Sequence, residues 1–139
     1  MKTQFTQNHV ALSLMVSRIS ASSTPSATRR HSFIINDIPK ELEVNTNENM
    51  LATIFGSLLN TVITHTENCC IRISAKLYGK VALIHLKQSH QPNKTAFNGS
   101  IRQVQQLAEK IGGTISINSE RSRATTIVFT FVNDLLLAA

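Results

Sequence analysis

The sequence predicts an α+β two-layer sandwich, in which helices cover one face of a mixed, largely antiparallel sheet. Two amphipathic helices, at residues 47–65 and 100–111, each carry one apolar face that a sheet must cover. Two further stretches, 70–87 and 114–132, alternate apolar and polar side chains around central turn residues, which is typical of antiparallel hairpins. In a sandwich with both helices on one side of the sheet, every one of these apolar faces is covered.

The first thirty residues are predicted to form a basic arm outside this domain. They contain four cationic side chains and no acidic one, and residues 20–30 read SASSTPSATRR, a composition typical of a linker. Apolar residues at near-helical spacing predict a short helix at 7–19. Two interpretations of that helix stay open, a docking or dimerisation element and a frayed terminus.

The domain itself is expected to span residues 31–134, beginning with extended segments at 32–36 and 42–45. The longest helix follows, with Asn47 as a plausible N-cap and its last turn near His65. Apolar residues repeat in this helix as pairs every four positions and predict a wide buried stripe. These residues are Met50, Leu51, Ile54, Phe55, Leu58, Leu59, Val62 and Ile63.

The remaining elements are a hairpin, a polar loop, a second helix and a second hairpin. The return strand 81–86 is apolar on both sides apart from His85, so we expect it to lie inside the sheet. A polar loop at 88–99 leads to a helix that begins at Ser100 and closes at Gly112-Gly113. The strands 114–118 and 125–132 complete the sheet, and an apolar tail, LLLAA (135–139), covers either the domain's own core or a second copy.

The charge distribution argues against nucleic acid and membranes as partners. The net charge is +6, but the first thirty residues supply four of these charges, since ten Lys/Arg face eight Asp/Glu in the remainder. A nucleic-acid-binding domain typically carries a dense basic stripe with aromatic residues, and this chain has one Tyr and no Trp. No apolar run reaches the ~18 residues of a membrane span, and the segment 9–23 is too short and too broken for a signal peptide. We therefore expect a cytoplasmic protein.

Two stretches carry a resemblance to a known family. They read ATIFGSLLNTVITHT (52–66) and VQQLAEKIGGTISINSERSRATTIVFTF (104–131). They resemble the Asn-box helix and the final helix, Gly-Gly, strand, turn and Thr-Thr strand of the ATP-binding domain of sensor histidine kinases. That domain belongs to the wider superfamily of gyrase, Hsp90 and MutL ATPases, and the likeness runs from about residue 31 to 132. It implies the Bergerat-type ATPase fold.

The resemblance also implies where a nucleotide pocket would lie. The pocket positions are Ser57, Asn60, Thr61, Thr64, His65, Gln88, His90, Gly99, Ser100 and Thr125. Aligning the His-Thr that ends the Asn-box helix puts Thr61 at the magnesium-binding Asn and Thr64 at the Lys that meets phosphate. Asn60 sits one residue early, about 100° round the helix. A Thr has a shorter reach than an amide and only one hydroxyl, so neither change preserves the original chemistry.

The remaining nucleotide motifs are altered as well. Gln88 stands at the Asp that reads the adenine amino group, and His90 stands near the first Gly of the same motif. Gln88 can still accept one hydrogen bond from an amino group. Asn98-Gly99-Ser100 is all that remains of the Gly-rich segment under the phosphates, and Ala124 replaces the Gly before Thr-Thr.

These changes together predict a degenerate domain that does not hydrolyse ATP. We expect no catalytic residue, no metal and no cofactor, and a role in signal transduction through a protein partner: a kinase, a response regulator or a second copy in a homodimer. Two alternatives stay open: a genuine kinase domain that uses ATP and Mg²⁺, and a sensor that binds adenine nucleotides without metal. The adjacent Cys69 and Cys70 form neither a disulfide framework nor a zinc site and are expected to be reduced thiols.

Overall fold

The computed structural model describes residues 9–89, 94–119 and 124–133. The predicted pocket residue His90 and the predicted tail 135–139 lie outside these residues. Along the chain the elements are β1 (His9–Ala11), α2 (Leu12–Arg29), β2 (Phe33–Asn36), β3 (Glu43–Asn45), α3 (Glu48–Thr64), β4 (Cys70–Tyr78), β5 (Val81–Gln88), α4 (Lys94–Ala108), the 3-10 turn η1 (Glu109–Ile111), β6 (Thr114–Ser119) and β7 (Thr125–Val132).

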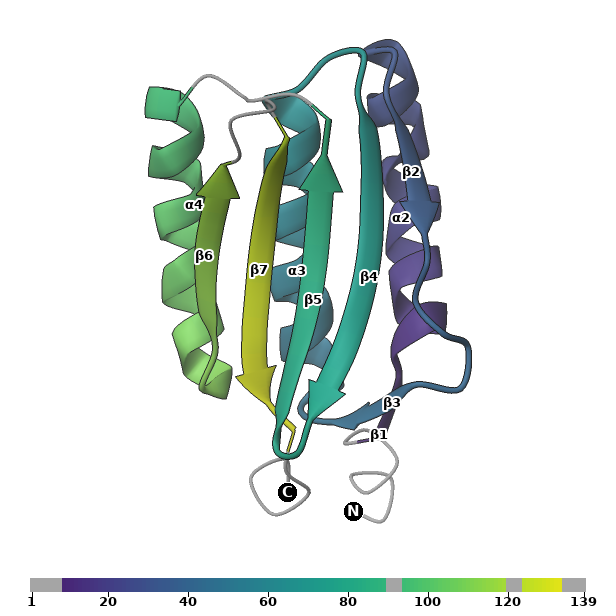
Figure 1. Ribbon diagram of the computed structural model, residues 1–139, viewed down its shortest axis with the longest axis vertical. Helices are drawn as coiled ribbons and strands as arrows, with labels where there is room; N and C mark the ends of the chain where they lie inside the picture. The colour runs from purple at the N-terminus through teal and green to yellow at the C-terminus, as the bar shows by residue number, and fades with distance from the viewer. Residues whose placement is uncertain (1–8, 90–93, 120–123, 134–139) are drawn as a thin grey trace.

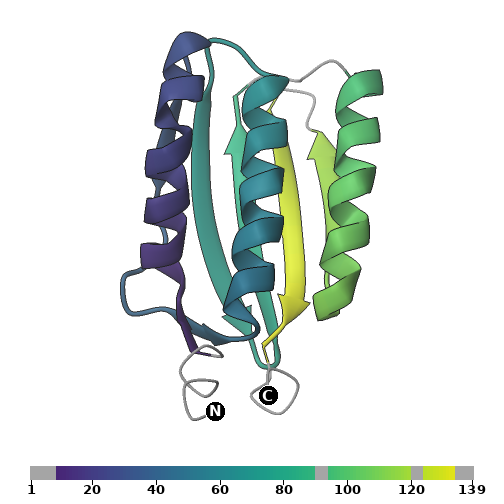
Figure 2. The same ribbon diagram turned by 180° about the vertical axis from the view of Figure 1, so that it is seen from behind.

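The described chain forms two layers, a five-stranded sheet and three helices on one of its faces (Figures 1 and 2). The strand order is β2-β4-β5-β7-β6, with β2 parallel to β4 and every other neighbouring pair antiparallel. The predicted fold class is therefore confirmed. So is the interior position of β5, because β4 and β7 pair with its two edges.

The predicted linker at 20–30 is wrong, because residues 12–29 form the single helix α2. Its buried side chains Leu12, Met15, Val16 and Ala27 belong to the same core as α3 and the sheet. The helix contains Pro25, which lacks a backbone donor, and on the residue before it Thr24 Oγ1 donates to the carbonyl of Ser20 at 2.8 Å. The strand β1 directly precedes α2 and pairs with β3, so residues 9–30 belong to the sandwich.

The helix α3 follows the sequence prediction closely. The Asn47 side chain accepts a hydrogen bond from the Met50 N–H at 3.0 Å, as an N-cap does. Its predicted apolar pairs are buried from Leu51 onward, and Met50 is half-buried at the edge of the core. The helix ends at Thr64, with His65 as its C-cap, and it lies between α2 and α4 across the middle of the sheet (Figure 2).

The helix α4 begins at Lys94, six residues before the predicted start at Ser100. Phe97 is buried and continues the apolar face of Ile101 and Val104 by one more turn, which favours helix over loop. At the other end Gly112 adopts the left-handed conformation with a φ of 68°, as predicted for a C-cap. None of the helices in the described ranges is long and apolar enough to cross a membrane.

Candidate functional site

A groove of about 330 Å³ lies between α3 and α4 and brings together six of the predicted pocket residues. They are Ser57, Asn60, Thr61, Thr64, His65 and Ser100. The groove is completed on the α4 side by Gln103, Val104 and Leu107, which are not among the predicted pocket residues. Their spacing was the available signal, because positions 100, 103, 104 and 107 share one face of a helix.

Asn60 and Thr61 both line the groove, so the offset of Asn60 round the helix does not remove it from the site. Their environments differ: Asn60 is exposed, whereas Thr61 is buried and its hydroxyl donates to the Ser57 carbonyl at 2.9 Å. The donor of Thr61 is therefore used within its own helix. Asn60 provides the free amide of the pair.

His65 closes the groove at the end of α3. Its Nδ1 lies 2.8 Å from the carbonyl oxygen of Thr61, an arrangement in which Nδ1 carries the proton and donates. The imidazole ring meets the ring of Phe97 edge to face, with centroids 5.7 Å apart and planes at 74°. This contact joins the C-terminal end of α3 to the first turns of α4.

A second pair of predicted residues, Gln88 and Thr125, lies buried in the sheet at the same end of the sandwich. The two residues are direct partners in the β5–β7 ladder and are 1% and 0% exposed. Neither the Gln88 amide oxygen and nitrogen nor the Thr125 hydroxyl has a hydrogen-bond partner among the described residues. Here β5 ends, β7 begins, α3 ends and α4 begins (Figure 1). Buried polar atoms without partners are costly and indicate a place for a polar ligand or water.

Gly99, the last of the predicted pocket residues in the described chain, does not form a close cradle. It lies inside α4, is exposed, and has no heavy atom within 4 Å of the position that a Cβ would take. A larger hollow of about 410 Å³ beside the N-terminus of α3 contains none of the predicted site residues.

Hydroxyl, amide, imidazole and apolar side chains make up the described lining of the groove. The usual occupant of this type of site, by the resemblance, is ATP with Mg²⁺. Magnesium prefers a tight octahedral set of oxygens, which usually includes carboxylates, and a triphosphate needs cations beside it. The described lining offers neither a carboxylate nor an ammonium or guanidinium group, and it does not fit magnesium triphosphate. The Gln88 amide fits an adenine edge, because it can donate and accept side by side.

Similarity to known proteins was found at the level of structure. No family model and no curated protein matches the sequence. The histidine kinase AdeS of Acinetobacter baumannii superposes with a TM-score of 0.77 and 10% identity, over 91% of this chain and 68% of that one. The catalytic domain of the histidine kinase ThkA gives a TM-score of 0.74 and 12% identity, over 93% and 97% of the two chains. ThkA in complex with the response regulator TrrA superposes with a TM-score of 0.72 and 11% identity, over 92% of this chain and 42% of that one.

These likenesses show the fold of the protein. The chain has the histidine kinase-like ATPase fold, and six of the residues predicted for a nucleotide pocket line the groove between α3 and α4.

Proposed function

We propose that this chain acts in signal transduction as a non-catalytic module that binds a protein partner. The observation that supports this role is that the described lining of the α3–α4 groove contains no carboxylate, ammonium or guanidinium group. Thr61 uses its hydroxyl donor within α3, and Thr64 supplies a neutral hydroxyl where the resemblance places a phosphate-binding Lys. A site that transfers a phosphoryl group must stabilise several negative charges, and catalysis of that kind is almost entirely positioning and electrostatic stabilisation.

A protein of this signalling class is the partner that the comparisons favour. ThkA was solved in complex with a response regulator, which supports a partner of that kind. The proposal accordingly extends to a kinase, a response regulator or a second copy of this chain. The cytoplasm, where such partners act, is the expected location.

Calorimetric titration of the full chain with ATP and ADP, with and without Mg²⁺, tests the proposal. We expect no magnesium-dependent binding below about 1 mM. A matched variant, Thr61→Asn with Thr64→Lys, returns both positions to the pattern of the family and is expected to gain magnesium-dependent binding. Magnesium-dependent binding or phosphotransfer by the unmodified chain would contradict the proposal and favour a genuine kinase domain.

A metal-independent adenine nucleotide sensor is the second candidate, supported by Gln88 and Thr125. Their unpartnered buried atoms would find partners in the edge of a bound base. In this case ADP and adenosine bind equally with and without Mg²⁺, and Gln88→Ala weakens both by at least about tenfold. Gln103→Ala, which alters an exposed groove amide, is the control. If Gln103→Ala abolished binding and Gln88→Ala did not, the base would not bind at Gln88.

A further inference from the structure

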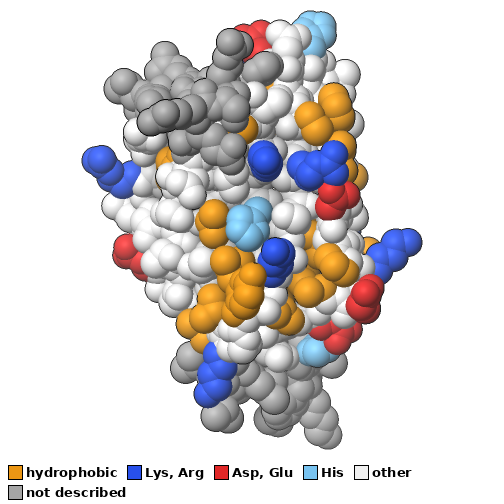
Figure 3. Space-filling view, viewed as in Figure 1, with side chains coloured by type: hydrophobic (Ala, Val, Ile, Leu, Met, Phe, Trp, Pro, Cys, Tyr) orange, Lys and Arg blue, Asp and Glu red, His pale blue; other side chains and the backbone are white. Residues whose placement is uncertain are grey.

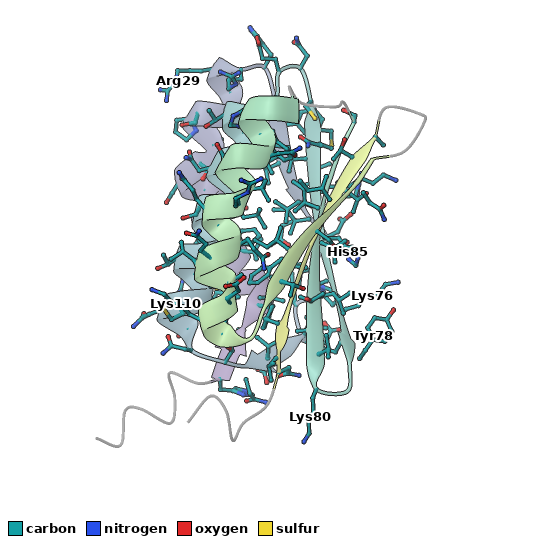
Figure 4. The ribbon with its side chains drawn as sticks, turned by 90° about the vertical axis from the view of Figure 1, so that its left-hand side faces the viewer. Arg29, Lys76, Tyr78, Lys80, His85 and Lys110 are labelled. Carbon is teal, nitrogen blue, oxygen red and sulfur yellow. The ribbon has the colours of Figure 1, made fainter. Side chains whose placement is uncertain are left out.

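The face of the sheet opposite the helices is uncovered in the described chain. The register of the strands places a set of apolar side chains on this face, which we call the open-face patch. Its members are Phe33, Ile35, Tyr78, Val81, Leu83 and Val128. Phe33, Tyr78 and Val81 are 58%, 60% and 43% exposed. In Figure 4, Tyr78, Lys76 and His85 lie on the side of the sheet away from the helices.

Cations accompany this patch, and the acidic residue beside it, Asp37, is paired with Arg72. Arg72, Lys76 and Lys87 stand on the same face of β4 and β5, and the register pairs Lys76 directly with Leu83. Arg72 is paired with Asp37, whereas Lys76 and Lys87 make no ion pair with a described residue. The outward positions of β4 to β7 within the described ranges contain no Asp or Glu. Figure 3 shows hydrophobic side chains gathered around a histidine and a lysine, with acidic side chains toward the margin of the face.

The pKa of His85, at the centre of this face, depends on the charges around it. It lies between Ser74 on β4 and Val128 on β7. Partial burial lowers the pKa of His85, and the charge of Lys76 lowers it further. An anionic group placed over the patch would act on the imidazole in the opposite direction.

We propose that the open-face patch docks an amphipathic helix of a partner protein, whose apolar stripe covers the patch and whose acidic side chains face Lys76 and Lys87. This proposal rests on the role as an interaction module and names the surface and the chemistry of its partner. Val81 and Lys87 lie six residues apart on β5, which corresponds to about 20 Å. A helix of about 13 residues spans that length.

Charge distinguishes this occupant from two others. A second copy of the chain would bring Lys76 and Lys87 of each copy toward the same cations of the other, and juxtaposed like charges disfavour association. A lipid surface is recognised by clusters of about four to eight Lys or Arg, more than this face presents. Apolar helices of soluble partners commonly bind apolar surfaces through residues at i, i+3, i+4 and i+7.

The test uses a synthetic 14-residue helical peptide, about four turns long, with Leu at i, i+3, i+4 and i+7 and Glu on both flanks. A control peptide carries Lys in place of every Glu. Each is titrated into the isotope-labelled full chain and followed by NMR. We expect saturable shifts at outward positions of β4, β5 and β7, with the control peptide at least about tenfold weaker. The imidazole signals of His85 should show a pKa that rises when the Glu peptide binds.

Two charge-reversal variants of equal net charge separate local from overall electrostatics. Lys76→Glu with Lys87→Glu is expected to weaken the Glu peptide at least about tenfold. Arg102→Glu with Lys110→Glu changes exposed cations of the helix layer and should leave binding within about twofold. Unchanged binding by the first variant would overturn the proposal.

Other outcomes overturn it in different ways. Shifts confined to the α3–α4 groove, or no shifts up to about 1 mM peptide, would show that this face binds no such helix. Concentration-dependent shifts of β4, β5 and β7 without peptide would favour a second copy. Tighter binding to phosphatidylserine vesicles than to peptide would favour a lipid surface. These outcomes leave the proposed function untouched. The proposed function fails only if calorimetry detects magnesium-dependent nucleotide binding.

Discussion

Thr61 illustrates how one side chain changes the chemistry of the groove. Its hydroxyl donates to the carbonyl of Ser57 within the same helix, which is a common use of Thr in a helix. A primary amide at this position would extend further and keep both a donor and an acceptor available. Under the proposed function, Thr61 is a buried residue of α3 whose hydroxyl proton is engaged within the helix and is not offered to a ligand.

Thr125→Val is expected to raise the free energy of unfolding by about 1 kcal/mol. The substitution keeps the shape of the side chain and removes a fully buried hydroxyl that has no partner among the described residues. Urea denaturation measures the change, and Thr126→Val, on the half-buried outward position next to it, is the control with little expected effect. Destabilisation by Thr125→Val would mean that the hydroxyl has a partner.

His9 should make stability depend on pH through the β1–β3 pair. Hydrogen bonds to Asn45 and to Glu43, at 3.0 and 2.6 Å, raise the pKa of His9 above its ordinary value near 6.5. The protonated form is thus favoured in the folded protein. The resulting stabilisation is fully present below the unfolded pKa and is lost as the pH rises through the folded pKa.

His9→Gln tests this dependence. We expect the difference in unfolding free energy between wild type and variant to be larger at about pH 5.5 than at about pH 8.5. The comparison cancels the contribution of His85, whose lowered pKa acts in the opposite sense. A difference that stays constant over this range would show that His9 has the same pKa in both states.

Helix periodicity fixes which residues share a face, so part of the groove lining follows from the sequence. The resemblance assigns Ser57, Thr61 and Thr64 to one pocket, and in the structure all three line the α3–α4 groove. Sequence could not show that the Gln88 amide lacks a partner among the described residues. That property depends on which groups from β7 and the helices surround it, and these contacts are not local in the chain.

At the scale of elements, α2 and α4 show where composition misleads. Serine, threonine and proline disfavour a helix in isolation, so the stretch 20–30 resembles a linker. In the structure the buried residues Val16 and Ala27 hold α2 on the core, and tertiary packing outweighs the weak local preference. For α4, a Gly-Ser pair resembles a cap, but the buried Phe97 extends the helix past it.

Two glycines near these elements should respond to Ala in opposite directions. At Gly113 an added Cβ would lie 2.7 Å from the Thr130 carbonyl and 3.1 Å from that of Ala108, so Gly113→Ala should destabilise the fold by about 1–3 kcal/mol. At Gly99, exposed within α4 and free of neighbours within 4 Å, Gly99→Ala should stabilise it by about 0.5–1 kcal/mol. Thermal and urea unfolding measure both. Equal effects would contradict the close approach at Gly113.

At the scale of the whole molecule, all three helices share one core with the inner face of the sheet. Val10 and Val16 belong to the same buried cluster as Phe55 and Phe129, although they are far apart in the sequence. A core of this kind usually unfolds in a single cooperative transition. The sequence predicted this layer arrangement correctly because two amphipathic helices and two hairpins leave few other ways to bury their apolar faces.

Hydrogen exchange should therefore protect the central amides of α2 to nearly the same opening free energy as those of α3. An arm outside the domain would instead exchange at almost the rate of an unfolded peptide. Val16→Ala is expected to lower the global unfolding free energy by about 2 kcal/mol, because Val16 is fully buried. Arg18→Ala, on the exposed side of the same helix, serves as the control. Fast exchange throughout α2, with α3 protected, would contradict the shared core.

The position of β7 has a consequence for how the protein is made. This strand is the last one in the described chain, yet it lies between β5 and β6 in the sheet. On the ribosome, at about 5–20 residues per second, β5 emerges well before its second neighbour, and β6 emerges with no partner at all. The nascent chain thus carries an open strand edge until residues 125–132 are available. Folding of the sheet is consequently a late event in synthesis, and translation that stops before β7 leaves a product prone to aggregate.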